Sequence, residues 1–181
     1  MALTSTIYTF DIELSDIDRG VYETLALRVP RHPSESAEYF VTRLVAYCRE
    51  YADGIAFSRG LSDPDEPTLA VRDLTGAVTT WVEIGAPDAA RLHKASKTGA
   101  RVAVYTHKDP RQLVRNWSGT RIHRVEALEV YSLDASFVAD LTSRLDRRME
   151  LGVTIADGTV LAALGAEAIS GTLTRVTLDS P

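Results

Sequence analysis

The chain has 181 residues, of which 45% are hydrophobic and 25% are charged, a composition typical of a globular protein rather than of a disordered or collagen-like one. The length favours a single domain over residues 1–181. No apolar run approaches the length of a transmembrane helix, and residues 1–11 lack the features of a secretory signal. A single cysteine, Cys48, excludes an intrachain disulfide framework and a cysteine-rich zinc site. We therefore expect a cytoplasmic protein with no membrane partner.

Charge is distributed unevenly along the chain. The formal net charge is −5, but residues 91–124 carry nine basic residues and one acidic residue, Asp109, which is a local charge of +8. The basic residues are Arg91, Lys94, Lys97, Arg101, Lys108, Arg111, Arg115, Arg121 and Arg124. Such a segment can form a positive face that attracts phosphate while the whole protein stays acidic. The alternative is that several separate helix and loop surfaces are basic.

The N-terminal part of the sequence predicts a hairpin followed by a helix. Residues 3–14 and 21–29 are rich in strand-forming residues, and residues 15–20 have turn chemistry. Apolar residues then recur with helical periodicity over 34–52, at Ala37, Phe40, Val41, Leu44, Val45 and Cys48. Cys48 lies in this stripe, so we interpret it as a core residue rather than a nucleophile.

The remaining elements alternate between strands and helices. We expect a loop over 59–67, strands over 69–72 and 78–84, a helix over 87–97, a strand over 102–105 and a helix over 110–117. A strand over 125–131, a helix capped by Asp134, a hairpin turning at Asp157-Gly158 and a strand near 172–178 complete the order. This order predicts an α/β (α+β) fold with a mixed central sheet flanked by helices. Residues 34–106 form an α-β-β-α-β unit within it, and extra strands lie at both ends.

One carboxylate, Glu83, falls near the end of an otherwise apolar strand. Burying it without a partner is costly, so it needs an arginine, a metal or a hydrogen-bonding backbone. Arg72 on the neighbouring strand could form an ion pair with it. A divalent cation such as Mg²⁺, which prefers oxygen ligands, could also bind it and activate water.

The helix after Glu83 carries Arg91, Lys94 and Lys97 at intervals of three residues, so these side chains share one face. The face is either simply solvated or directed at phosphate. Trp117, within the basic stretch, could stack on an unpaired base, although a tryptophan at a helix end is more often a core residue.

Several short segments, taken in order, give the chain a specific resemblance. They are 2–8 (ALTSTIY), 31–35 (RHPSE), 57–61 (FSRGL), 65–67 (DEP) and 81–88 (WVEIGAPD). Together they resemble the bacterial YaeQ family over essentially the whole chain. Members of that family are similar in fold to the PD-(D/E)XK nucleases, so the resemblance implies a nuclease-like core over about 34–106.

The same resemblance implies a set of site residues. In such nucleases, acids from the first core helix and two core strands bind metal, and a lysine follows the last acid. Carried over, Glu38 (or Glu35) is the helix acid and Glu83 is the third-strand acid. The second-strand position is Thr68, for which Glu66 or Asp65 could substitute. The lysine position is Gly85, for which Lys94 (with Arg91 or Lys97) from the following helix could substitute. The implied catalytic residues are Glu83, Lys94 and Glu38, and the implied ligands of Mg²⁺ or Mn²⁺ are Glu83, Glu66 and Glu38.

Three functional hypotheses follow. The first is a Mg²⁺-dependent phosphodiesterase or nuclease with a degenerate site. The second is a non-catalytic module that binds nucleic acid or protein, with Arg91, Lys97, Arg111 and Arg115 as the candidate nucleic-acid contacts. The third is a structural or small-molecule role, in which Glu83 is neutralised by Arg72 or Arg91. A fold alone does not choose among them.

Overall fold

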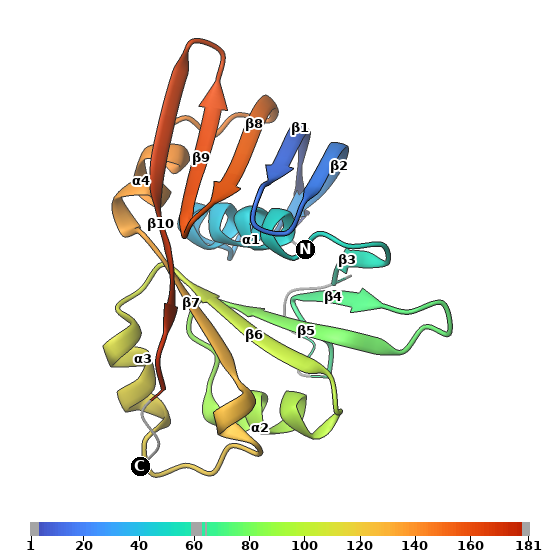
Figure 1. The fold of residues 1–181 in the computed structure, drawn as a ribbon, viewed down its shortest axis with the longest axis vertical. Helices are drawn as coiled ribbons and strands as arrows, with labels where there is room; N and C mark the ends of the chain where they lie inside the picture. The colour runs from blue at the N-terminus through green and yellow to red at the C-terminus, as the bar shows by residue number, and fades with distance from the viewer. Residues whose placement is uncertain (1–3, 59–62, 64, 179–181) are drawn as a thin grey trace. The chain divides into compact units, whose positions relative to one another are not determined.

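The computed structural model describes residues 4–58, 63 and 65–178. By its internal contacts the chain divides into two compact units: the first comprises Met1–Arg49 and Leu133–Leu173, and the second comprises Glu50–Ser132 and Thr174–Pro181. Figure 1 shows the elements of both. Residues 2–3 and 59–61, which belong to segments that carry the resemblance to the YaeQ family, lie outside the described residues.

The first unit is built on a five-stranded sheet. β1 (Thr6–Asp16) and β2 (Val21–Arg31) form the predicted antiparallel hairpin. β8 (Arg148–Ala156) pairs parallel to β1, and β9 (Thr159–Leu164) joins β8 to β10 (Glu167–Val176), so the strand order is β2-β1-β8-β9-β10. Asp157 and Gly158 both have positive φ, +49° and +71°, in the turn between β8 and β9, which confirms the hairpin predicted from Asp-Gly.

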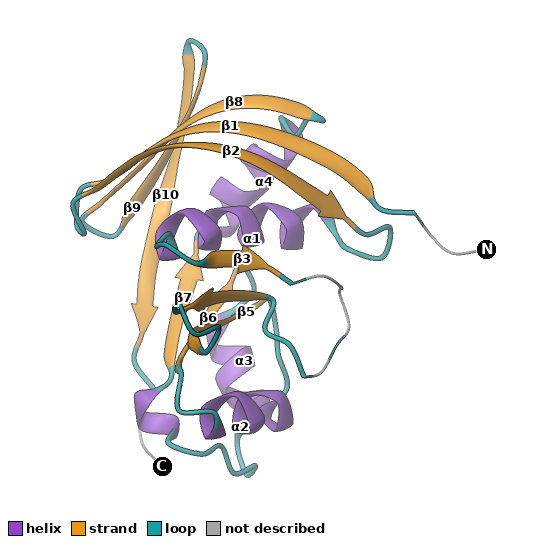
Figure 2. Cartoon of the chain, turned by 90° about the vertical axis from the view of Figure 1, so that its right-hand side faces the viewer, coloured by secondary structure: helices purple, strands orange, loops and turns teal. Residues whose placement is uncertain are grey.

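Helix α1 (Ala37–Glu50) packs on the sheet of the first unit (Figure 2). Alternate residues of β1 are buried, and the Phe10 ring lies 6.0 Å from the ring of Phe40 on α1. Most of the predicted apolar stripe is confirmed: Phe40, Val41, Leu44, Val45 and Cys48 are all buried, whereas Ala37 at the start of the helix is half-buried. Burial raises the pKa of the Cys48 thiol to about 12, so the structure confirms that this residue belongs to the core. The second helix of this unit, α4 (Ala135–Ser143), is capped by Asp134 as expected.

The second unit contains a mixed sheet. β3 (Ile55–Phe57), β4 (Leu69–Arg72) and β5 (Val78–Ile84) are antiparallel neighbours, whereas β5, β6 (Arg101–Thr106) and β7 (Glu129–Leu133) run parallel. Parallel strands need crossovers, and these are α2 (Ala89–Lys97) and α3 (Pro110–Trp117). The two helices begin at the N-caps Asp88 and Asp109, each of which accepts a backbone N–H.

The core of the second unit lies between this sheet and its two helices. Its members include Trp81 and Val104 from the strands, Leu92 from α2, and Leu113 and Trp117 from α3. Trp117 is 6% exposed, and its indole N–H donates to the carbonyl of Pro87 at 2.9 Å. This tryptophan is therefore a core residue rather than a platform for a nucleobase.

Two predicted strand boundaries are wrong. Residues 125–127 form a short 3₁₀ helix, η1 (Val125–Ala127), because Arg124 has a left-handed backbone and its carbonyl accepts the N–H of Ala127. The backbone hydrogen bonds of these residues are made within the 3₁₀ helix, so strand pairing begins only at Glu129 in β7. The last strand begins at Glu167 rather than near 172, because it folds back directly on β9, with Glu167 opposite Leu164.

The predicted fold class is confirmed at the level of a mixed α/β fold with four α-helices among the described residues. The nuclease-like core over 34–106 stays a prediction, because α1 lies almost wholly in the first unit and the strands of that core lie in the second. In the part of the chain that the structure describes, no helix has the length and apolar character that a bilayer crossing requires.

Candidate functional site

Glu83 occupies the predicted place near the end of β5 and is 2% exposed. Successive side chains of a strand alternate between faces, so Glu83 shares its face with Trp81. The strand ends at Ile84, and Gly85 follows with φ +81° while its N–H donates to the carbonyl of Tyr105. A residue with a side chain would cost about 1–2 kcal/mol in this left-handed conformation. The turn therefore favours glycine at the position where the nuclease pattern has lysine.

Both oxygens of the Glu83 carboxylate accept hydrogen bonds. The indole N–H of Trp81 donates to Oε1 at 2.6 Å. The Nε of Arg91 lies 2.7 Å from Oε2, and the hydroxyl of Thr68 donates to the same oxygen at 3.3 Å. The buried charge is thus neutralised by an arginine and solvated by two neutral donors.

Arg91 connects this carboxylate to the segment before β4. Its backbone N–H is held by the cap Asp88, and its guanidinium donates to the carbonyls of Asp63 at 3.2 Å and Glu66 at 2.7 Å. The same guanidinium contacts Glu83, so one side chain connects β5 and α2 with Asp63 and Glu66. This arrangement has a structural role, because the guanidinium binds one carboxylate and two backbone carbonyls from three different parts of the chain.

The other implied catalytic residues have different partners or positions. Lys94, one turn after Arg91, forms an ion pair with Asp65 on the surface rather than with Glu83. Glu38 is exposed in the first turn of α1 and belongs to the first unit. Glu66 contributes its backbone carbonyl to Arg91. The contacts of Glu83 therefore include neither the lysine nor the second carboxylate that the resemblance implies.

The remaining candidates, Arg72 and Glu35, each have a partner other than Glu83. Arg72, proposed as a neighbour of Glu83, is exposed and donates to the carbonyl of Gly76 at 3.1 Å. Glu35, the alternative helix acid, is buried in the first unit, where the Nε of Arg43 lies 2.9 Å from its carboxylate. Burial raises the pKa of Glu35, and the charge of Arg43 opposes that shift.

These side chains do not fit a Mg²⁺ or Mn²⁺ site. Residues 4–58, 63 and 65–178 contain no group of three or more His, Cys, Asp and Glu side chains that could hold a metal. At Glu83 the neighbours are a guanidinium and two hydrogen-bond donors, whereas a hard cation needs several oxygen ligands. Binding by Glu83, Glu66 and Glu38 thus gains no support from the contacts.

The basic stretch separates into paired and unpaired side chains. Besides Arg91 and Lys94, Arg101 is paired: its guanidinium contacts Glu50 at 2.7 and 3.0 Å and also contacts Glu129. Although burial opposes it, hydrogen bonding to Glu50 and Glu129 raises the pKa of Arg101. No local pattern in the sequence predicts this network, because Glu50 and Glu129 are far from Arg101 along the chain.

The other six basic residues of the stretch are exposed and form no ion pair with an acidic side chain that the structure describes. We call them the unpaired cations: Lys97, Lys108, Arg111, Arg115, Arg121 and Arg124. Arg115 donates to the neutral side chain of Gln112. Asp109, the acid within this stretch, caps α3 by accepting the N–H of Arg111. Three of the four predicted nucleic-acid contacts are therefore available, and the fourth, Arg91, is engaged with Glu83.

The fold and these contacts define a mixed α/β protein with a buried carboxylate paired to an arginine and a separate set of unpaired cations. The model of the YaeQ protein family matches residues 1–172, which is nearly the whole sequence. The chain belongs to the YaeQ family, as the sequence predicted.

Individual relatives agree with this assignment. The chain is 33% identical to "Uncharacterized protein YaeQ" of Escherichia coli K12 over 161 residues, which cover 88% of this chain and 89% of the relative. It is 32% identical to the YaeQ protein of Pseudomonas syringae, whose crystal structure superposes with a TM-score of 0.83 over 97% of both chains. The YaeQ protein of Xanthomonas axonopodis pv. citri gives a TM-score of 0.84 at 32% identity, over 95% of this chain and 98% of that one.

Proposed function

We propose that this protein binds nucleic acid without cleaving it, through phosphate contacts of the unpaired cations. The observation that carries the proposal is that six exposed basic side chains between residues 97 and 124 have no acidic partner among the described residues. The rest of the chain is strongly acidic and therefore repels a polyanion. A polyanion is thus expected to bind at this segment. Neutralising phosphates releases condensed counterions, which is the main source of affinity for such surfaces.

The arrangement of α3 supports this proposal. Leu113 and Trp117 face the core, whereas Arg111 and Arg115 are exposed and four residues apart. Side chains at this spacing are neighbours on one helix face. Lys108 precedes the same helix and is also exposed. Three cations on and before one short helix are suited to successive phosphates of a nucleic-acid backbone.

The surroundings of Glu83 support the non-catalytic form of the function. Metal-assisted cleavage of a phosphodiester needs carboxylates that hold the cation and an activated water. Here the carboxylate is neutralised by Arg91 and accepts the indole N–H of Trp81. We propose that the relation to the PD-(D/E)XK nucleases is one of fold, with the place of the metal taken by an arginine.

The proposal is tested by fluorescence anisotropy with labelled single strands over a range of salt concentrations. Removing two phosphate contacts with Arg111→Gln/Arg115→Gln should reduce the salt slope by about 1.4, and at 0.1 M salt it should weaken binding about 25-fold. Arg72→Gln removes one exposed charge outside the segment and serves as the matched control, with affinity expected within about twofold of the wild type.

Two outcomes would overturn the proposal. One is the absence of binding to single or double strands even at about 20 mM salt, where electrostatic affinity is greatest. The other is cleavage of the strands that requires Mg²⁺ or Mn²⁺ and disappears in Glu83→Gln, which would favour the hydrolase hypothesis. Under the proposal, Glu83→Gln binds nucleic acid as the wild type does.

A further inference from the structure

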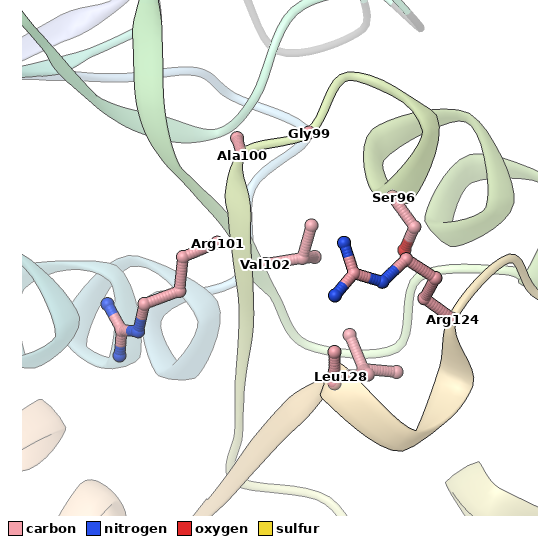
Figure 3. Close-up of a pocket in the computed structure, with 8 residues that line it drawn as sticks. Ser96, Gly99, Ala100, Arg101, Val102, Arg124 and Leu128 are labelled. Carbon is pink, nitrogen blue, oxygen red and sulfur yellow. The ribbon is translucent and has the colours of Figure 1, made fainter.

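A pocket of about 250 Å³ lies at the start of β6, and one of the unpaired cations projects into it (Figure 3). Its walls come from Ser96 at the end of α2, from Gly99 in the turn before β6, and from Val102 on β6. Arg124 and Leu128, on either side of η1, complete it. All of these residues belong to the second unit.

Arg124 has an unusual backbone for an arginine. Its φ and ψ are both +48°, and among the described residues other than glycine only Asp157 shares a positive φ. Asp157 lies in an Asp-Gly hairpin turn, where that conformation is common. A left-handed conformation at a long side chain is costly, and such strain is concentrated at functional positions. Here the strained residue is the one whose side chain enters the pocket.

No acidic side chain among the described residues forms an ion pair with the guanidinium of Arg124. Figure 3 shows the guanidinium of Arg124 directed between Ser96, Val102 and Leu128, whereas the side chain of Arg101 leaves on the other side of β6, where it pairs with Glu50 and Glu129. The pocket therefore combines one guanidinium fork and one hydroxyl with apolar walls.

We infer that this pocket binds the terminal phosphate of a nucleic-acid strand, a specificity that rests on the proposed function. A guanidinium binds two phosphate oxygens through parallel N–H donors, and the Ser96 hydroxyl supplies a donor for a third. A terminal phosphate carries a charge of about −1.5 to −2 and presents three free oxygens. An internal phosphodiester is esterified on both sides, so it has only two free oxygens and the strand would have to enter and leave the recess. Val102 and Leu128 provide apolar surface for the adjoining sugar.

The test compares three single strands of one sequence, carrying a 5′-phosphate, a 3′-phosphate or hydroxyls at both ends, by fluorescence anisotropy. The wild type should bind one phosphorylated strand about tenfold more tightly than the hydroxyl-ended strand, as expected for charge-assisted hydrogen bonds. Arg124→Asn should lose that preference while keeping the fold, because asparagine tolerates the left-handed backbone. Arg121→Asn, the matched control, should weaken binding of all three strands equally and retain the preference.

The outcomes separate this inference from the function on which it rests. Equal affinity of the wild type for all three strands would refute the pocket specificity and leave the proposed function intact. A preference that survives in Arg124→Asn would refute it as well, because the specificity would then lie elsewhere. No binding of any strand would refute the proposed function and the inference together.

Discussion

Replacing Glu83 with alanine should destabilise the protein, because its carboxylate holds three donors in the second unit. The substitution leaves the Arg91 guanidinium without its counter-ion and the buried indole N–H of Trp81 without an acceptor. Removing one partner of a buried ion pair costs about 3–5 kcal/mol. The Arg91 side chain is 24% exposed, so water can solvate part of the orphaned charge. We therefore expect a loss near the lower end, about 3 kcal/mol.

Two further variants separate charge from packing. Glu83→Gln also removes the counter-ion of Arg91, but it retains the side-chain volume and one acceptor oxygen, so it should cost less than Glu83→Ala, about 1–2 kcal/mol. Arg91→Met should be more damaging than Glu83→Gln, because it leaves a carboxylate that is 2% exposed without its cation. The double variant Glu83→Gln/Arg91→Met should be more stable than the sum of the single losses implies, by about 1–3 kcal/mol.

Urea denaturation followed by circular dichroism gives the free energy of unfolding of each variant. The decisive result is the sign of the change in the free energy of unfolding caused by Glu83→Ala. If that variant were as stable as the wild type or more stable, Glu83 would be held at a cost to stability, as functional groups often are. The structural role assigned to the pair would then be wrong, and the hydrolase hypothesis would gain support.

Three other predictions concern groups outside this pair. The Cys48 thiol, whose pKa burial raises to about 12, should resist a thiol reagent at pH 8 until urea unfolds the protein, and rapid labelling of the native protein would contradict this. Burial also raises the pKa of Glu35, so the native state holds its proton to higher pH than the unfolded chain does. The free energy of unfolding should therefore rise as the pH falls through the folded-state pKa toward 4.5, and denaturation of Glu35→Gln across that range should lack this contribution. Arg101→Met removes the guanidinium that pairs with Glu50, which is 6% exposed, and should lower the free energy of unfolding by about 3 kcal/mol; an unchanged urea midpoint would contradict this.

Local signals in the sequence predicted most of the elements. Strands over 69–72 and 78–84 and the helix over 110–117 coincide with β4, β5 and α3. Each depends on information within a few residues: apolar runs, a turn between two strands, and a proline after an aspartate cap. The 3₁₀ segment after Arg124 was missed because its cause is the left-handed backbone of an arginine, for which residue type gives no warning.

Contacts between distant residues were harder to predict. The network of Arg101 with Glu50 and Glu129 joins residues that are 51 and 28 positions apart. A single sequence contains many acids that an arginine could contact, and only the packed fold selects among them. The same limit applies to the pocket at Arg124, whose walls come from α2, β6 and η1.

The partner of Glu83 is an instructive intermediate case, since strand register could have excluded one candidate. Residues 73–76 form the short turn between β4 and β5, which places Arg72 opposite Val78. Glu83 lies five residues further along β5 and pairs with no residue of β4 near Arg72. By contrast, α2 follows the carboxyl end of β5 directly, so the first turn of the helix passes close to Glu83. Arg91 lies in that first turn, where its backbone N–H donates to the cap Asp88. A short strand-to-helix connection after a buried acid therefore favours an arginine on the helix as its partner over an arginine across the turn.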